Sequence, residues 1–171
     1  MAASDLDSRL ASALQTQMNR ELFASLTYKQ MRADLRLAGW YGFHKFMHSQ
    51  ENDELKHARC FDHFLSERGV RPVFTTVQPQ PILYSPENPL YYFEAALELE
   101  ENFWSYLNDI YQMSEDVDDP DTCTLLYKFI DEQHDSVDGL KHIVQKLKRA
   151  GTDQAALLII DKKVQEIYES K

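Results

Sequence analysis

The chain has 171 residues, 43% of them hydrophobic and 27% charged, which is typical of one soluble globular domain with a sizeable core. Its formal net charge of −10 argues against a nucleic-acid partner, because binding a phosphate backbone needs clustered Lys and Arg. No apolar run approaches the roughly 20 residues of a membrane span and the N-terminus lacks a signal-peptide core, so we expect a cytoplasmic protein without a membrane partner.

Glycine and proline divide the chain into helical segments. The apolar periodicity predicts four long helices over 5–37, 42–68, 90–116 and 121–149, followed by a shorter fifth helix over 153–168. Gly39, Gly69 and Gly151 fall at the predicted helix ends. No segment shows the clear alternation that is typical of a strand. The expected fold class is therefore all-α, with residues 1–171 in a single domain.

The connectors predict how these helices are arranged. Short turns near 38–41 and 117–120 join antiparallel neighbours. The connector 70–89 is Pro-rich, and its twenty residues can reach about 66 Å at roughly 3.3 Å per residue. A helix of 27 residues is only about 40 Å long. Because the connector can cross the whole bundle, the sequence predicts a four-helix bundle with one long crossover between the second and third helices.

Each long helix carries a polar residue in the middle of its apolar stripe. Glu21 interrupts the first stripe, Glu54 and His57 the second, Glu100 the third and Gln133 the fourth. The two helical hairpins are in similar register, because 33 residues separate Glu21 from Glu54 and also Glu100 from Gln133. The third stripe illustrates the pattern: Phe93, Leu97, Glu100, Trp104 and Leu107.

These polar residues favour a metal site over ordinary core positions. A lone Glu-x-x-His pair such as Glu54 and His57 is more often a solvated or intrahelical pair, and Tyr28 alone is more often a core residue. Three core glutamates without Lys or Arg on the same stripes nevertheless need a counter-ion, because a buried carboxylate costs several kcal/mol unless it is paired or metal-bound. Oxygen-rich ligation with one imidazole suits iron or manganese better than structural zinc. The combination therefore predicts a di-metal site.

Four segments of the chain resemble the long helices of the ferritin family. They read QMNRELFASLTY, DELKHARCFDHFL, LELEENFWSYLNDI and FIDEQHDSV, and the similarity extends to ALLIIDKKV in the fifth helix. The resemblance implies a ferritin-like bundle with a ferroxidase centre formed by Glu21, Tyr28, Glu54, His57, Glu100 and Gln133. Glu21, Glu54 and His57 would hold the first iron, and Glu54 would bridge to a second iron on Glu100. Gln133 would lie beside the pair, with Tyr28 as a hydrogen-bonding and redox-active neighbour.

The resemblance also distinguishes branches of the family. In bacterioferritins, a methionine between the Glu and His of the second helix binds haem, whereas this chain has Leu55, which has no donor atom. Bacterioferritins also carry a second Glu-x-x-His on the fourth helix, where this chain has Gln133 and Ser136. We therefore expect a non-haem ferritin of bacterial type.

The implied function is that of an iron-storage ferroxidase. Such a protein oxidises Fe(II) with O2 or H2O2 and keeps the product as ferric mineral inside a closed homo-oligomeric shell of twenty-four subunits. Two alternatives stay open, namely a soluble di-iron oxidase or peroxidase without storage and a subunit that builds the shell without catalysis. The acidic turn EDVDDPD at 115–121 is either a solvated turn with a helix N-cap or a cation funnel for iron entry.

A third iron site is expected to be weak, transient or absent. Many bacterial ferritins build one from four glutamates, at positions that here read Asp53, Glu132, Asp135 and Ser136. One carboxylate is missing and two are a methylene shorter, so fewer anionic oxygens can reach one ion.

Overall fold

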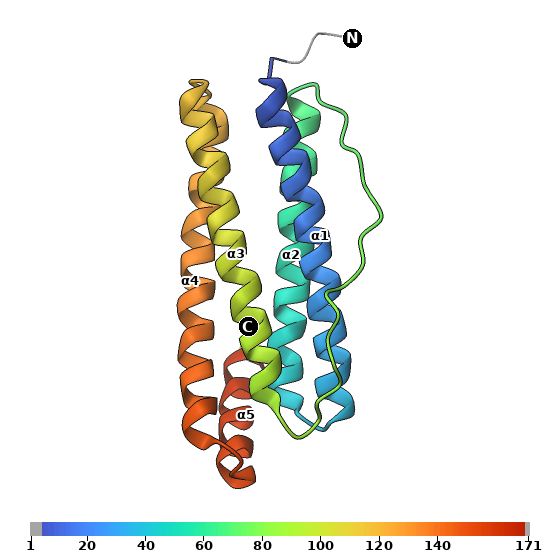
Figure 1. Ribbon diagram of the computed structural model, residues 1–171, viewed down its shortest axis with the longest axis vertical. Coiled ribbons are helices and arrows are strands. Elements are labelled where there is room, and N and C mark those ends of the chain that lie inside the picture. Colours follow the sequence, from blue (N-terminus) through green and yellow to red (C-terminus); the bar gives the residue numbers. More distant parts are fainter. Residues whose placement is uncertain (1–4, 170–171) are drawn as a thin grey trace.

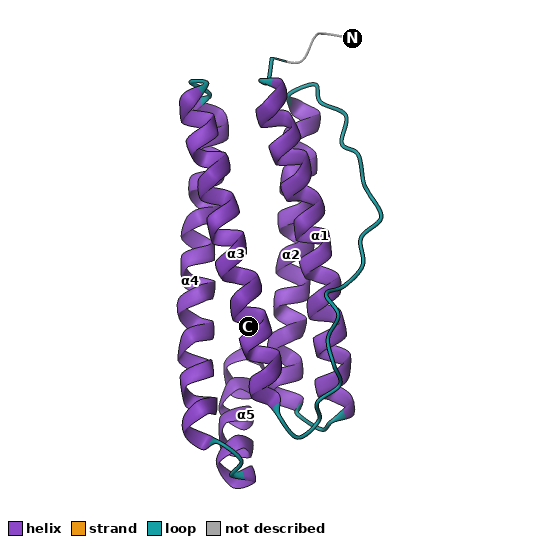
Figure 2. Cartoon of the chain, viewed as in Figure 1, coloured by secondary structure: helices purple, strands orange, loops and turns teal. Residues whose placement is uncertain are grey.

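The computed structural model describes residues 5–169 and has five helices in that range (Figure 1). They are α1 (Ser8–Leu37), α2 (Tyr41–Glu67), α3 (Pro89–Asp116), α4 (Pro120–Ala150) and α5 (Gln154–Glu169). No strand occurs between residues 5 and 169, and all remaining described segments are loops or turns (Figure 2). The all-α class, with four long helices and a short fifth one, is confirmed. No helix in this range has both the length and the apolar character that a membrane crossing requires.

The long crossover is also confirmed. The connector from α2 to α3 runs along the outer side of α1 from one end of the bundle to the other, so α2 and α3 are parallel (Figure 1). Side chains of α1 hold it in place: Asn19 donates to the carbonyl of Val73 (3.0 Å) and accepts from the backbone N–H of Thr75 (2.9 Å). Further along, the Thr27 hydroxyl accepts from the backbone N–H of Gln80 (2.9 Å).

Local capping signals explain where most of the helices begin. The carboxylate of Asp7 accepts from the backbone N–H groups of Arg9 (2.9 Å) and Leu10 (3.2 Å), so α1 begins at Ser8 and not at residue 5 as predicted. Pro89 and Pro120 occupy the first turns of α3 and α4, where a missing N–H costs no hydrogen bond. These two helices therefore begin one residue earlier than the prediction.

The start of α2 is capped from a distant part of the chain. Its own N-cap residue, Trp40, makes no capping hydrogen bond with its side chain. Instead, the carboxylate of Asp161 in α5 accepts from the backbone N–H of Phe43 (2.8 Å). An acceptor at this position satisfies one of the free N–H groups of a helix N-terminus and lies at the positive end of its dipole. This contact fixes α5 against the beginning of α2.

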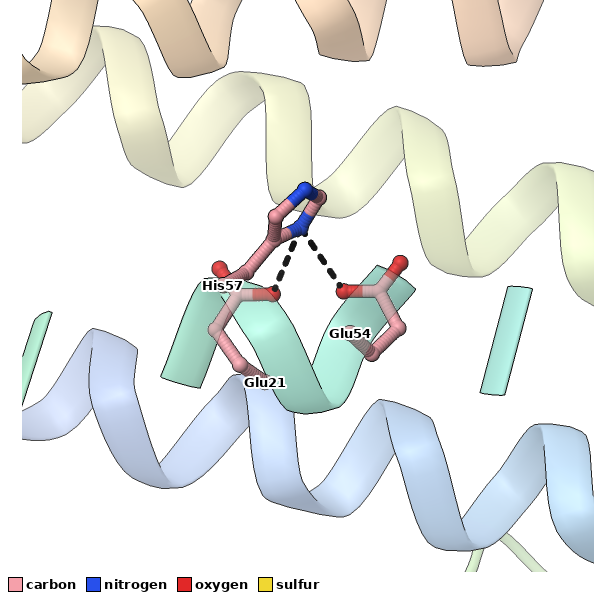
Figure 3. Close-up of side chains that lie close together, drawn as sticks. All are labelled: Glu21, Glu54 and His57. Carbon is pink, nitrogen blue, oxygen red and sulfur yellow. Dashed lines mark ion pairs between the residues drawn. The ribbon is translucent and has the colours of Figure 1, made fainter. Parts of the chain in front are cut away.

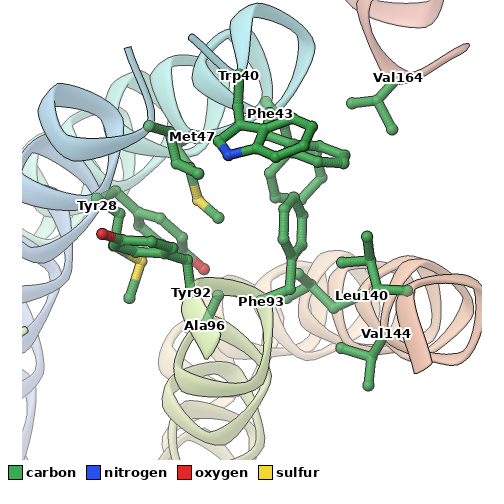
Figure 4. Close-up of a cluster of buried hydrophobic side chains, with 14 of the residues drawn as sticks. Tyr28, Trp40, Phe43, Met47, Tyr92, Phe93, Ala96, Leu140, Val144 and Val164 are labelled. Carbon is green, nitrogen blue, oxygen red and sulfur yellow. The ribbon is translucent and has the colours of Figure 1, made fainter. Parts of the chain in front are cut away.

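The core consists of two apolar clusters, one toward each end of the bundle. The cluster near α5 contains many aromatic side chains, including Tyr28, Phe43, Tyr92 and Phe93 (Figure 4). The other cluster is mainly aliphatic: Leu6, Leu10, Leu14, Met18, Phe61, Leu65, Leu107, Ile110, Leu126 and Phe129. Trp104 belongs to neither, because its exposed fraction is 45%, so its predicted place in the third stripe is wrong. Phe103 is buried instead, which corresponds to a rotation of α3 by one position, or about 100°.

The acidic turn before α4 has a structural role at one of its carboxylates. Asp119 accepts from the backbone N–H of Thr122 (3.0 Å) and caps α4. The guanidinium of Arg68, at the end of α2, contacts both oxygens of the same carboxylate (3.1 and 2.8 Å) and also reaches Asp5 (2.8 Å). Arg68 holds the pKa of Asp119 below its usual range, although burial opposes this shift.

Replacing Asp119 with asparagine should lower stability at pH 7 by about 2 kcal/mol, the range of a hydrogen bond to a charged group. The amide keeps the N-cap but loses the charge that Arg68 contacts. Because the carboxyl pKa is lowered in the folded state, its contribution is complete above about pH 4 and disappears as the pH falls through the folded value. Denaturant unfolding should therefore show a difference from wild type that shrinks toward pH 3.

Asp121→Asn is the control for this prediction. It removes an exposed carboxylate from the same turn, so it should change stability by less than about 0.5 kcal/mol. Equal losses in the two variants would show that the net charge of the turn, and not the contact with Arg68, determines the effect.

Candidate metal centre

The polar side chains predicted from the sequence lie between the two apolar clusters, apart from Tyr28, which belongs to the cluster near α5. Glu21 and Tyr28 come from α1, Glu54 and His57 from α2, Glu100 from α3 and Gln133 from α4. All are buried except His57, whose side chain is 20% exposed. Each glutamate is held inside by the apolar residues one turn away on its own helix, because residues three or four apart share a helix face.

Three of these residues form a group that could hold a metal ion. Glu21, Glu54 and His57 offer ligand atoms that all lie within 4.8 Å of one another. Figure 3 shows Nδ1 of His57 facing both carboxylates, at 3.8 Å from Oε2 of Glu21 and 3.4 Å from Oε2 of Glu54. Both of these Oε2 atoms are buried and make no hydrogen bond. Buried anionic oxygens without hydrogen bonds are costly, so their convergence on one imidazole nitrogen fits a cation bound among them.

Glu100 on α3 provides a further buried carboxylate, which contacts residues of α1 and α4. The Tyr28 hydroxyl donates to one carboxylate oxygen of Glu100, and the Gln133 amide donates to the other. The same amide of Gln133 also lies 3.1 Å from the backbone carbonyl of Glu100. Tyr28 and Gln133 therefore fix the orientation of Glu100 from two sides. Glu100 is outside the group of three, but its charge acts on Glu54.

The charges at this centre are poorly balanced without a metal. Burial, together with the charges of Glu100 and Glu21, raises the pKa of Glu54 well above its usual range. Burial also raises the pKa of Glu100 to about 7, against the hydrogen bonds from Tyr28 and Gln133. Within residues 5–169, no Lys or Arg lies at ion-pair distance from Glu21, Glu54 or Glu100.

The imidazole is the one basic group near these carboxylates in the described residues. Burial lowers the pKa of His57, but Glu21 and Glu54 outweigh burial and raise it to about 11. A proton on His57 therefore supplies the positive charge that a divalent cation would otherwise bring. Because a metal ligand must be deprotonated, a bound cation would replace this proton.

The structure also reveals positioning residues that the sequence analysis missed. Gln17 is fully buried, and its amide donates to Oε1 of Glu21 (2.7 Å), which leaves Oε2 facing His57. The ring of Phe129 lies edge-on to the His57 ring, with 5.1 Å between centroids. The spacing of four residues between Gln17 and Glu21 could have revealed the first contact. No local pattern indicates the second, because it joins α2 to α4.

The residues of the expected third site do not form a group of ligands. In the part of the chain that the structure describes, Asp53, Glu132 and Asp135 do not bring three ligand atoms within 4.8 Å of one another. Asp53 contacts Lys56 (2.8 Å), and the side chain of Asp135 is 88% exposed. Glu132 contacts His57 instead, at 3.3 Å from Nε2. The weak third site stays a prediction.

Comparisons with known proteins agree on one family. The family model described as "Ferritin-like domain" matches residues 11–150. The chain is 28% identical to the "Bacterial non-heme ferritin" of Escherichia coli O157:H7 over 159 residues, which cover 93% of this chain and 95% of that protein. It is also 28% identical to the "Ferritin" of Pacifastacus leniusculus over 158 residues, which cover 89% and 85%.

The fold is similar to that of a solved archaeal structure. The open pore ferritin from Archaeoglobus fulgidus superimposes with a TM-score of 0.88 and 30% sequence identity. The match covers 94% of this chain and 98% of that chain.

Proposed function

The chain belongs to the ferritin family, and from this premise we propose that it is an iron-storage ferroxidase. It binds Fe(II) as its substrate at Glu21, Glu54, His57 and Glu100, passes the electrons to O2 or H2O2, and keeps the ferric product inside a closed shell. The observation that carries this proposal is the convergence of two buried carboxylate oxygens without hydrogen bonds on Nδ1 of His57.

The candidate ligands form two iron positions. Glu21 and His57 hold the first Fe(II) together with Glu54. The charge of Glu100 raises the pKa of Glu54, so the two groups interact. This interaction supports a bridging role of Glu54 toward a second Fe(II) on Glu100. Hard carboxylate oxygens stabilise Fe(III) more than Fe(II), so the ligand set favours oxidation. Gln133 and Tyr28 keep Glu100 aimed at the centre while iron enters and leaves.

Loading this centre should release a proton. His57 carries a proton that faces the two carboxylates, because these groups raise its pKa to about 11. The imidazole must lose this proton to act as a ligand. The bound Fe(II) then supplies the positive charge that the proton provided.

Storage requires assembly into a container, which we propose is the twenty-four-subunit homo-oligomeric shell of the family. Exposed apolar residues on α5, namely Leu158, Ile159 and Ile167, fit contacts between subunits better than contacts with water. Size-exclusion chromatography separates this proposal from the alternative of a soluble oxidase or peroxidase, because a monomer or dimer cannot enclose a mineral. The candidate ligand set argues against the second alternative, a subunit without catalysis.

We propose no haem site in this protein. Leu55 lies between the two candidate ligands of α2 and has no donor atom, so this position offers no ligand to a haem iron. A cytoplasmic location also stays a prediction.

Crystals soaked briefly in Fe(II) without oxygen should contain two ordered irons per subunit. One should lie among Glu21, Glu54 and His57, and the other between Glu54 and Glu100, because these carboxylates are buried and have no Lys or Arg partner within residues 5–169. Anomalous scattering at the iron edge locates the ions. Crystals of His57→Ala serve as the control, in which the first iron should lose occupancy. Iron absent from this centre, or three equally occupied sites per subunit, would contradict the proposal.

A further inference from the structure

The second ring nitrogen of His57 is in contact with a carboxylate from another helix. Nδ1 faces Glu21 and Glu54, whereas Nε2 lies 3.3 Å from Oε2 of Glu132 in α4. In Figure 3 the two nitrogens are on opposite sides of the ring, and only Nδ1 points toward the two carboxylates drawn there. The imidazole is thus placed between the candidate metal ligands on one side and Glu132 on the other.

Each carboxylate oxygen of Glu132 lies near a basic group. Oε2 contacts His57, and Oε1 lies 3.7 Å from Nζ of Lys128, one turn earlier on α4. Lys128 compensates the charge of the carboxylate. A carboxylate that is shared between Lys128 and His57 is poorly placed to act as a ligand of a third ion.

Three residues of α4 act on the centre without contributing to its group of three ligands. Phe129 contacts the His57 ring edge-on, Glu132 contacts its Nε2, and Gln133 donates to Glu100. Positions 129, 132 and 133 share one helix face, because they are spaced by three and four residues. Phe129 and Glu132 thus both contact the His57 ring from α4, one at its edge and the other at Nε2.

We propose that Glu132 is a positioning residue, which accepts the Nε2 proton of His57 and so keeps Nδ1 facing the metal. This inference rests on the proposed function. A neutral imidazole that binds a cation through Nδ1 must carry its proton on Nε2, and an anionic acceptor at that proton fixes the tautomer and makes Nδ1 a better ligand. Because His57 is partly exposed, water replaces the acceptor when Glu132 is removed, so the effect is a weakening and not a complete loss.

The test uses Co(II), which binds without being oxidised, on the assembled full-length protein. Glu132→Ala should weaken the tightest Co(II) site by about 10-fold or more, as expected for loss of an acceptor behind a metal-bound histidine. Its visible Co(II) spectrum should also change, because the nitrogen ligand is less firmly held. Glu132→Gln should restore affinity and spectrum, because its amide oxygen can accept the Nε2 proton.

Asp131→Asn is the matched control, since it removes one exposed carboxylate from the adjacent position on α4. It should bind Co(II) as the wild type does. Wild-type affinity in Glu132→Ala would overturn the inference, and so would equal weakening in Glu132→Gln and Glu132→Ala, which would indicate a charge effect or direct ligation. If the wild type neither binds Co(II) nor oxidises Fe(II), the proposed function fails and the inference falls with it. If it does both while Glu132→Ala matches it, only the inference fails.

Discussion

Replacing Glu54 with alanine should slow the fast oxidation of Fe(II) by at least about 100-fold while the shell still assembles. Even loss of a group behind a metal ligand costs about 10- to 100-fold, and Glu54 is the residue proposed to contact both irons. Its Oε2 faces Nδ1 of His57, and the charges of Glu21 and Glu100 act on its carboxyl group. Stopped-flow absorbance after addition of two Fe(II) per subunit measures this phase.

The same substitution should leave the metal-free protein as stable as the wild type or more stable. Burial and two neighbouring carboxylates raise the pKa of Glu54, so ionising it disfavours the folded state. A raised carboxyl pKa makes the folded state lose stability, relative to the unfolded chain, as the pH rises above about 4.3, the ordinary value for glutamate. Alanine removes this term, so the stability of the variant relative to wild type should increase from pH 4 to pH 8.

Glu98→Ala is the control for both effects. Glu98 is an exposed glutamate on α3, so its removal should alter neither the oxidation rate nor the pH dependence of stability. Wild-type oxidation kinetics in Glu54→Ala would show that the candidate centre is not the site of Fe(II) oxidation. Slow oxidation together with a disrupted shell would show that the substitution acts through the structure and not through iron binding.

Replacing Gly42 with alanine should detach α5 from the bundle. A Cβ atom at Gly42 would lie 1.8 Å from the carbonyl oxygen of Asp161, 2.7 Å from its carbonyl carbon and 3.0 Å from the backbone nitrogen of Gln165. These atoms belong to the backbone of α5, so no change of rotamer relieves the overlap. Forcing extra volume into such a contact costs about 3 kcal/mol or more, which exceeds the gain of about 1 kcal/mol in helix propensity.

Detachment has a second consequence at the start of α2. Moving α5 withdraws the Asp161 carboxylate from the backbone N–H of Phe43, so the first turn of α2 loses its cap. Hydrogen exchange should therefore become faster both in α5 and in the first turn of α2, and the assembled shell should be less stable to heat.

Gly139→Ala provides the opposite expectation within the same chain. Gly139 lies inside α4, and a Cβ atom there would meet nothing within 4 Å. Alanine should stabilise α4 by up to about 1 kcal/mol.

If Gly42→Ala leaves hydrogen exchange in α5 unchanged, the close approach of α2 and α5 is not rigid.

The sequence alone determined the architecture, because its signals are local. Apolar periodicity, Pro89, Pro120 and the glycines at helix ends act within a few residues, so they define the helices with small errors at their boundaries. The crossover followed from connector length alone. The layer of Glu21, Glu54, Glu100 and Gln133 was visible for the same reason, since a polar residue in the middle of an apolar stripe is recognised from its own helix. Which of these residues bind iron stays a proposal.

Only the tertiary structure decided the contacts between helices. The exposure of Trp104 depends on the rotation of α3 about its own axis. Neighbouring residues on a helix point about 100° apart, so burying Phe103 instead of Trp104 corresponds to a rotation of that size. Asp161 caps α2 across 118 residues of chain, and Glu132 contacts His57 from α4. Helix periodicity identifies the face on which a side chain lies, whereas its partner depends on how distant helices pack together. For that reason the layer of site residues was predictable, and the groups that position them were not.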